Sequence, residues 1–375
     1  MVSVDVSDVV RKMDELMKSK KVLLLCPYPI GKAPSQRFRF EQYLPFLEEN
    51  GFDITVKPFI DYQLWDLLYK PGLFAQKTIG MLKSTFNRFA LLFNVRKYDF
   101  IFMHREAMQF GPPVVEFILT KVLRKKVLYD YDDAIWLKNH SDSNALLSFT
   151  KWYSKVNSIC GWVHTVQCGN QYLADFARQY NQNVHIIPTT IDTVGMHNKT
   201  IDYSRERLAI GWTGSHSTMH YLDMIYPVLL RLEEKYNFDF LVISDRKPTF
   251  ELKSLVYCKW DKINEVDDLC KIDIGVMPLR NNEWSEGKCA FKGLQYMSLG
   301  IPTVMSPVGV NKSLIQDKEN GYLVDTEDEW YDILAYLLKN KEARMRIGAK
   351  GDETVEKYYS VEALKAKYLS LFQGM

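Results

Sequence analysis

The sequence predicts an α/β protein with two doubly wound domains that face each other across a cleft. Its 375 residues exceed the size at which a single hydrophobic core usually stops growing. Short apolar runs alternate with longer amphipathic segments in both halves, which is typical of parallel sheets flanked by helices. A polar stretch over residues 189–207 interrupts this alternation. We therefore expect one domain over residues 1–188 and a second over residues 189–375.

The first half begins with an apolar run that ends at Pro27, as a buried parallel strand would. A helix is expected from Arg37 to Glu49, because the following Asn-Gly pair is a stop signal. A second helix, over residues 112–123, starts with proline. The strands expected in this half are residues 22–27, 53–56, 99–103, 126–129, 162–166 and 184–187.

The second half repeats the alternation and then becomes helical from residue 326 to its end. Helices are expected over residues 219–236 and in the segment that Gly300 terminates. The expected strands are residues 208–212, 238–243, 273–277, 302–305 and 321–324. Sheets of this kind bind ligands beyond the carboxyl ends of their strands, so the cleft is the expected binding site.

Composition excludes several classes of protein. The formal net charge is only +2, without the basic excess of a dedicated nucleic-acid-binding protein. Six cysteines occur with no C-x-x-C pair, which argues against structural zinc and disulfides and fits a reducing cytoplasm. Residues 1–21 are charged and predict a short amphipathic helix instead of a secretory signal. No apolar run reaches the roughly 18 residues needed to span a bilayer.

A basic amphipathic stretch covers residues 66–97. It carries six basic residues and one acid, Asp66, and these are interleaved with phenylalanine, leucine, isoleucine and methionine. Such a segment can dock on the anionic surface of a membrane. It can equally be a helix that packs on the core and turns a solvated basic face outward. The sequence leaves both interpretations open.

A second polar pattern occurs in the segment EGKCAFKGLQYMSLGIPTVMSPVGV, residues 286–310. Lys288, Lys292 and Gln295 are spaced i, i+4 and i+7, which predicts that they share one helix face. Two ammonium groups near the start of a helix suit a phosphate, and the amide could bind a ribose diol. A helix with a solvated lysine face is the alternative.

The stretch GKCAFKGLQYMSLGIPTVMSPVGVN, residues 287–311, resembles the donor-binding signature of glycosyltransferase family 4, retaining enzymes of the GT-B fold. Other stretches are similar to further motifs of that family and follow in the same order along nearly the whole chain. They are PSQRFRFEQYLPFLEENGF (34–52), HREAMQFGPP (104–113), YDYDDAIW (129–136), GWTGSHST (211–218), DIGVMPL (273–279) and ENGYLV (319–324). The resemblance implies two Rossmann-like domains, the first binding the acceptor and the second the nucleotide sugar. It also implies that a final helix, about residues 360–372, crosses back to the first domain.

The resemblance implies a set of donor-side residues in the second domain. Gly214 and Ser215 lie against the nucleotide diphosphate, and Gln295 takes the ribose position. Gly309 and Val310 form the turn whose backbone N–H groups approach the ligand.

The implied catalytic residues are His104, Glu286, Lys288 and Lys292. The two lysines would neutralise the phosphates as the glycosidic bond breaks. His104 would contact the transferred sugar, unless it is a structural histidine.

On the acceptor side the resemblance implies Arg37, Arg39, Asp132 and Asp133. Together with Asp130, the two aspartates also resemble a D-x-D metal site. Enzymes of the GT-B fold typically need no metal, so no cofactor is expected.

The implied reaction is transfer of a sugar from a nucleotide diphosphate sugar to a glycan or lipid-linked glycan, with retention, in the synthesis of polysaccharide or glycoconjugate. Membrane contact through residues 66–97 would place the protein at the cytoplasmic face of the membrane.

The sequence departs from the family at two points. Gln295 replaces a glutamate, with Gly287 eight positions before it and Glu286 adjacent, and GWTGSHST lacks the family's Arg and Lys. A nucleotide-sugar epimerase and a non-catalytic nucleotide-sugar-binding subunit are therefore kept as alternatives.

Overall fold

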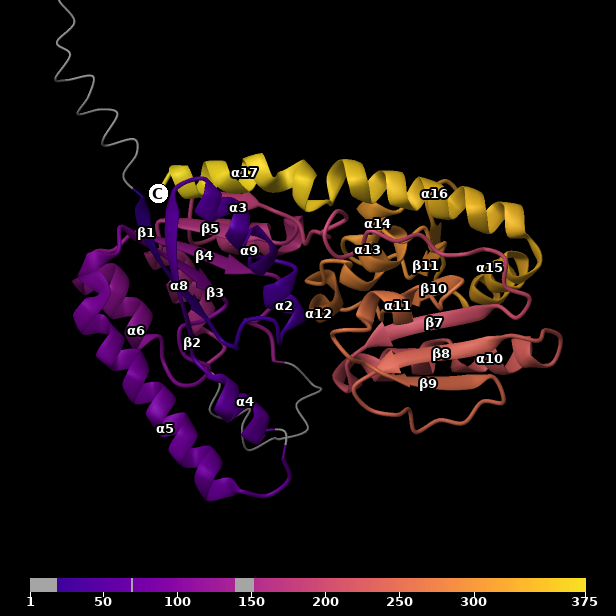
Figure 1. Cartoon of the computed structure of the whole chain (residues 1–375), viewed down its shortest axis with the longest axis horizontal. Coiled ribbons are helices and arrows are strands. Elements are labelled where there is room, and N and C mark those ends of the chain that lie inside the picture. Colours follow the sequence, from indigo (N-terminus) through magenta and orange to yellow (C-terminus); the bar gives the residue numbers. More distant parts are fainter. Residues whose placement is uncertain (1–18, 69, 139–151) are drawn as a thin grey trace, which may run out of the picture.

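The chain forms two parallel six-stranded sheets that lie side by side and are flanked by helices (Figure 1). This computed structural model describes residues 19–68, 70–138 and 152–375. One sheet is built from residues 20–186 and the other from residues 209–323. The α/β class expected from the sequence is confirmed.

The first sheet takes its strands from the apolar runs of the first half. In spatial order they are β2 (Phe52–Pro58), β1 (Lys20–Cys26), β3 (Phe100–His104), β4 (Val127–Tyr131), β5 (Thr165–Cys168) and β6 (Val184–Ile186). All residues of β3, β4 and β5 are buried, because helices cover both faces of a parallel sheet.

The second sheet has the same architecture. In spatial order its strands are β12 (Tyr322–Leu323), β11 (Thr303–Met305), β10 (Ile274–Met277), β7 (Ala209–Gly214), β8 (Asp239–Ser244) and β9 (Leu255–Lys259). The edge strand β9 is absent from the sequence expectation. It is only partly buried, so its residues lack the continuous apolar run that marks the central strands.

The helices of the first half are α2 (Pro34–Arg37), η1 (Glu41–Tyr43), α3 (Leu44–Glu49), α4 (Tyr62–Leu68), α5 (Phe74–Leu91), η2 (Leu92–Lys97), α6 (Val114–Phe117), η3 (Ile118–Val122), α8 (Lys155–Trp162) and α9 (Gln171–Arg178). Those of the second half are η4 (His216–Met224), α10 (Tyr226–Glu233), α11 (Glu265–Leu269), α12 (Glu283–Glu286), α13 (Phe291–Met297), α14 (Asn311–Leu314), α15 (Glu327–Lys339), α16 (Lys341–Tyr358) and α17 (Val361–Gln373).

The single helix expected from Arg37 to Glu49 is wrong. The segment is divided into α2, η1 and α3, with Pro45 in the first turn of α3. Phe38, Arg39 and Phe40 at the break are all buried, and consecutive residues of one helix cannot all face the core. Tertiary packing on several sides therefore overrides the helical pattern.

The two long C-terminal helices run along one side of both sheets (Figure 1). Helix α17 packs against the first sheet, where Tyr368 stacks on Tyr43 with ring centroids 4.1 Å apart. Phe372 stacks on Phe102 of β3 at 5.6 Å. The last residues of the chain thus belong to the hydrophobic core of the first half.

The helix expected over residues 1–21 falls almost entirely outside the described residues. Within residues 19–68, 70–138 and 152–375, no helix has the length and apolarity to cross a bilayer. All six cysteines are unpaired thiols. The cytoplasmic location stays a prediction.

Candidate active site

The segment before α13 lies at the interface between the two halves of the molecule, which we call the junction. The continuous helix expected to carry Lys288, Lys292 and Gln295 on one face is wrong. Helix α12 ends at Glu286 and α13 begins at Phe291, so Lys288 lies in an irregular stretch between them. Ala290 has a left-handed backbone with φ +54°, which no regular helix contains.

This irregular stretch owes its shape to contacts with the first half. A Cβ on Gly287 would lie 2.7 Å from the Cβ of Ala134, so the two backbones approach as closely as only glycine permits. The Sγ of Cys289 lies 3.1 Å from the backbone oxygen of Asp132. The amide nitrogen of Asn170 donates to the backbone oxygen of Lys288 at 3.1 Å.

A network of ion pairs spans the junction at the carboxyl ends of β3 and β4. Arg105 lies 2.7 Å from the Asp132 carboxylate and 2.8 Å from that of Asp133. Lys288 of the second half reaches the other oxygen of Asp133 at 2.9 Å. Burial alone would raise the pKa of Asp133, but the charges of Lys288 and Arg105 outweigh it and lower that pKa.

Arg105 was not among the expected site residues, although the loop that carries it was singled out. Its backbone is left-handed, with φ +58°, in the turn that follows β3. A non-glycine residue in this conformation is uncommon and often marks a functional turn. A basic residue two positions after an expected strand was the available signal.

These charged groups line a cavity of about 160 Å³ between the two halves. Five of the expected site residues meet there, namely Arg39, Asp132, Asp133, Lys288 and Lys292. The remaining wall is formed by Pro34, Ser35, Arg105, Thr189, Thr218, Tyr221, Met277, Leu279, Cys289, Ala290 and Phe291. The wall thus combines six charged side chains with apolar ones such as Met277, Leu279 and Phe291.

Lys292 is the distinctive group of this cavity. Its side chain is half-buried, with the ammonium 5.6 Å from the centre of the Trp212 ring. Desolvation, helped by the nearby charge of Lys288, lowers the pKa of Lys292 to about 8. In the described part of the chain no carboxylate forms an ion pair with it. A desolvated cation without a counter-ion favours binding of an anion.

Gly214 makes room for this lysine at the end of β7. A Cβ on Gly214 would lie 2.5 Å from the ring of Trp212 and 2.8 Å from the Cε of Lys292. Only glycine therefore allows the indole and the lysine side chain to lie over this strand end. Ser215 follows, and its hydroxyl bonds to that of Ser217 at 2.7 Å.

His104 lies behind the cavity in a buried polar network. It is fully buried, and its Nδ1 is 2.7 Å from Asp130, which also pairs with Arg39 and accepts from Gln167 at 2.9 Å. Burial opposes ionisation of Asp130, but the Arg39 charge and the His104 hydrogen bond lower its pKa to about 2. His104 does not line the cavity, so its contact with a sugar stays a prediction.

Gln295 and Arg37 meet in a second buried cluster across the junction. Arg37 forms an ion pair with Glu265 of α11, and the amide of Gln295 donates to the other oxygen of Glu265 at 3.2 Å. His197 lies 3.4 Å from the same amide. Gln295 is 1% exposed and does not line the cavity, and its ribose role stays a prediction. Glu265 and His197 were absent from the expected site.

Glu286, Gly309 and Val310 lie beside each other at the edge of the junction. A Cβ on Gly309, whose φ is +54°, would lie 2.9 Å from the backbone oxygen of Glu286. The Glu286 carboxylate faces Lys312 at 3.5 Å. Val310 lines a different cavity, described next.

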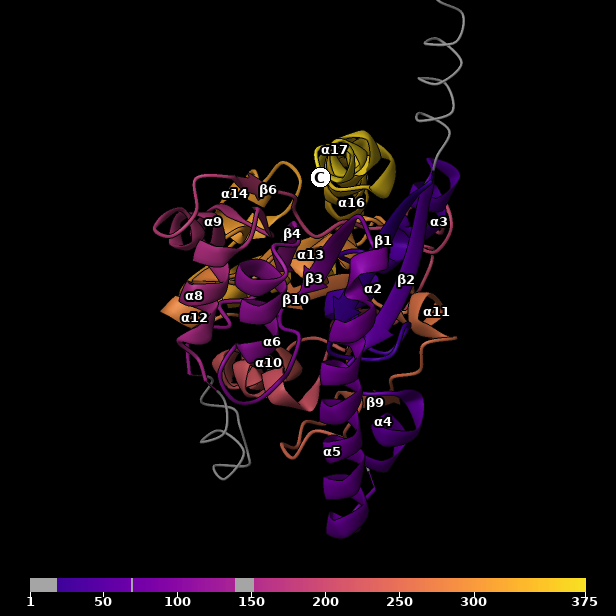
Figure 2. The same cartoon turned by 90° about the vertical axis from the view of Figure 1, so that its left-hand side faces the viewer.

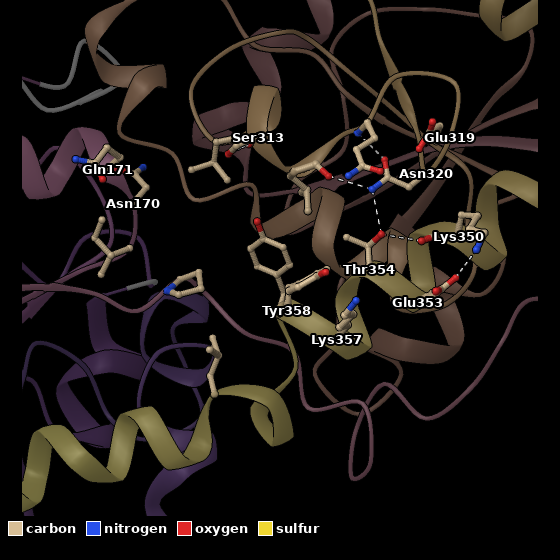
Figure 3. A pocket seen from close by; sticks show the side chains of 18 of the residues that line it. Asn170, Gln171, Ser313, Glu319, Asn320, Lys350, Glu353, Thr354, Lys357 and Tyr358 are labelled. Atoms are coloured by element: carbon tan, nitrogen blue, oxygen red, sulfur yellow. Dashed lines mark hydrogen bonds and ion pairs between the residues drawn. The ribbon is translucent and has the colours of Figure 1, made fainter.

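A larger cavity of about 730 Å³ lies between α9, α14, α16 and α17 (Figure 3). Several of its polar groups are paired within the protein: Asn320 bonds to Thr354 at 3.0 Å, and Lys350 pairs with Glu353 at 2.6 Å. Lys367 donates to the backbone oxygen of Ile186 at 2.9 Å. This cavity is the larger of the two, but the desolvated cation Lys292 lies in the smaller one, which is therefore the candidate site.

The three aspartates that resemble a metal motif do not converge. Asp130 faces Arg39 and His104, whereas Asp132 and Asp133 face Arg105. Among residues 19–68, 70–138 and 152–375, no three His, Cys, Asp or Glu side chains are grouped so as to hold a metal ion.

Comparisons with known proteins bear on this site. Residues 209–340 match the family model described as "Glycosyl transferases group 1". The matched region contains β7, the irregular stretch before α13 and α13 itself, which carry Gly214, Lys288 and Lys292. The finer assignment to family 4 stays a prediction. Comparison with curated protein sequences gives no significant match.

Solved structures show the same fold over nearly the whole chain. Sucrose-phosphate synthase from Thermosynechococcus elongatus is similar with a TM-score of 0.68 and 12% identity, over 95% of this chain and 98% of that chain. A glycosyltransferase from Rickettsia africae ESF-5 gives 0.66 and 11%, over 95% and 98%. Anabaena HepE in complex with UDP-glucose gives 0.64 and 13%, over 95% and 100%. At such identities the likeness concerns the fold, and it confirms the GT-B fold expected from the sequence.

Proposed function

We propose that this chain, a glycosyltransferase of the group 1 type with the GT-B fold, transfers a sugar from a nucleotide diphosphate sugar to a hydroxyl of a glycan or lipid-linked glycan, with retention of configuration. The observation that carries the proposal is the Lys292 ammonium. It is desolvated, lacks a carboxylate partner in the described chain, and faces a cavity between the two halves. A diphosphate supplies the missing anion.

The chemistry of sugar transfer fits this charge. When the glycosidic bond breaks, the departing nucleotide diphosphate gains negative charge. A cation already desolvated and positioned beside that phosphate stabilises the transition state more than the ground state. Lys292 would meet the leaving phosphate, and Lys288 would join it when its pairing with Asp133 is exchanged for the phosphate.

A uridine nucleotide is the first donor to test. The structural neighbour HepE of Anabaena is described in complexes with UDP and with UDP-glucose. This chain shares the fold of HepE over 95% of its own length. We carry the uridine diphosphate sugar over as a hypothesis about this chain.

Retention is supported by the ion pairs of the cavity carboxylates. An inverting transfer needs a side-chain base to accept the proton of the acceptor hydroxyl. Asp132 and Asp133 are held by Arg105 and Lys288, and the lowered pKa of Asp133 makes it a weak base. In a front-side mechanism the departing phosphate takes that proton, so no side-chain base is needed.

The acceptor would enter from the first half, past Ser35, Arg39 and Arg105. Their donors suit the hydroxyl groups of a sugar chain. We propose a glycan or lipid-linked glycan of polysaccharide or glycoconjugate synthesis as the acceptor class.

A thermal-shift panel with UDP, GDP, ADP, CMP and dTDP tests the donor half of the proposal. A ligand that binds only the folded protein raises its melting temperature. We expect one nucleoside diphosphate to stabilise the wild type and Lys253→Ala, an exposed lysine on the β8–β9 connection, but not Lys292→Ala. Equal stabilisation of Lys292→Ala, or no stabilisation by any nucleotide, would contradict the proposed site.

The transfer itself is tested by NMR of the product formed with the stabilising nucleotide's glucose donor. An α-linked product from an α-linked donor is expected. A β-linked product would refute retention, and interconversion of the donor without an acceptor would favour the epimerase.

A further inference from the structure

The long helix α5 turns its apolar side chains away from the protein. Ile79, Leu82 and Phe86 recur at helical spacing on one face, and Phe93 continues the row into η2. Their side chains are between 65% and 89% exposed. We call these four residues the outer stripe.

The opposite face of α5 packs on the first half, where Phe89 and Leu91 contact the hydrophobic core. Ser84 and Arg88 are its buried residues, and Arg88 donates to the backbone oxygen of Lys57 at 3.1 Å. Gly80 lets α4 approach, since a Cβ there would lie 2.6 Å from Leu64. The outer stripe is therefore not the core-facing side of an ordinary amphipathic helix, and a soluble protein rarely exposes such a row without a partner.

Exposed basic residues occur in α5, in η2 and in the segment before α5. Lys70, Lys83, Arg96 and Lys97 are exposed, and no acidic residue occurs from residue 70 to residue 97. Helix α5 runs along the outer side of the first half, at the lower left in Figure 1 and facing the viewer in Figure 2.

We propose that the outer stripe docks on an anionic lipid surface. The four apolar side chains enter the interface between headgroups and acyl chains, and the lysines and arginine contact lipid phosphates. A second copy of the chain is a poorer occupant, because pairing two stripes would bring like charges together. Of the two interpretations of residues 66–97, the proposal selects membrane docking over a solvated basic face. It does not depend on the proposed sugar transfer.

Co-sedimentation with vesicles tests the proposal on the full chain. The vesicles are phosphatidylcholine alone, or phosphatidylcholine with about a third of anionic phosphatidylglycerol. The stripe variant is Ile79→Ser/Leu82→Ser/Phe86→Ser. Its matched control is Gln76→Ala/Asn87→Ala/Asn94→Ala, three exposed polar residues of the same two helices. A third variant, Lys83→Glu/Arg96→Glu/Lys97→Glu, reverses the charge.

We expect the wild type and the matched control to bind the anionic vesicles and to bind neutral vesicles at least about tenfold more weakly. Both the stripe and charge variants should lose about tenfold or more in binding while keeping the wild-type melting temperature, since the mutated side chains are exposed. Absence of wild-type binding, or unchanged binding by a folded stripe variant, would overturn the proposal. So would a wild-type dimer in analytical ultracentrifugation that the stripe variant abolishes.

Discussion

Lys288 of the second half places its ammonium 2.9 Å from the carboxylate of Asp133 in the first half. The two residues are 155 positions apart in the chain. Arg105 holds the other oxygen of the same carboxylate. This bridge connects the two halves of the molecule at the candidate site.

A double-mutant cycle should detect the bridge. Both side chains are about one-fifth exposed, at 20% and 19%, so solvent screens the pair in part. We expect a coupling of about 1 kcal/mol between Lys288→Met and Asp133→Asn in urea unfolding. The pair Lys253→Met and Asp133→Asn should be additive and serves as the control. Additivity in the first cycle would show that the bridge contributes nothing to stability.

Nucleotide affinity should depend on pH through Lys292. Desolvation lowers its pKa to about 8, so the free protein loses this cation as the pH rises through that value. Binding of an anion needs the charged form, and affinity should therefore fall between about pH 7 and about pH 9.5. A Lys292→Arg variant stays charged over this range and should show a flatter profile. Parallel profiles for both proteins would rule out Lys292 as the titrating group.

Substitution of Gly214 should displace the side chains of Trp212 and Lys292 at the candidate site. The added methyl in Gly214→Ala would meet the Trp212 ring and the Lys292 side chain, at 2.5 and 2.8 Å. We expect overpacking to cost about 1–3 kcal/mol and nucleotide affinity to fall at least about tenfold. Gly161→Ala in α8 is the control, because its nearest neighbour would lie 3.7 Å away. Wild-type affinity in Gly214→Ala would contradict the placement of the phosphate.

Acid should weaken the network around Asp130. The pKa of this carboxyl is about 2 in the folded protein, below its ordinary 3.8. As the pH falls, the unfolded state takes up the proton first, so this stabilisation is present above about pH 4 and is lost as the pH approaches 2.

Urea unfolding of Asp130→Asn tests whether the ionised Asp130 stabilises the folded protein. The variant should be about 3–5 kcal/mol less stable at neutral pH, because it leaves Arg39 buried without its anion. The difference should shrink toward pH 3. Asp175→Asn, at a carboxylate that is 60% exposed, should show neither effect. A pH-independent difference for Asp130→Asn would contradict the ion-pair account.

The fold was largely predictable because its central strands are continuous apolar runs. Val22 to Cys26 are all buried, and sequence alone indicates that pattern. Strand β9 was not predicted because it is an edge strand with exposed residues. The helix expected across Arg39 failed for a different reason: packing on the core and an ion pair to Asp130 fix that residue, and no local pattern encodes them.

The site was predictable in part. Five expected residues do meet at one cavity, and they were found through the family resemblance together with charge. Periodicity alone failed at Lys288, which the expected helix would have placed on the same face as Lys292 and Gln295. Contacts with Ala134 and Asp132 of the first half shape that stretch, and local spacing carries no information about partners so distant in the chain.

A crystal structure of the chain with the stabilising nucleoside diphosphate tests the central claim most directly. The account predicts the β-phosphate within hydrogen-bonding distance of Lys292, beside Gly214, in the cavity shared by the two halves. A nucleotide seated instead in the larger cavity between α9 and α16, or one that leaves the Lys292 ammonium without an anionic partner, would contradict it.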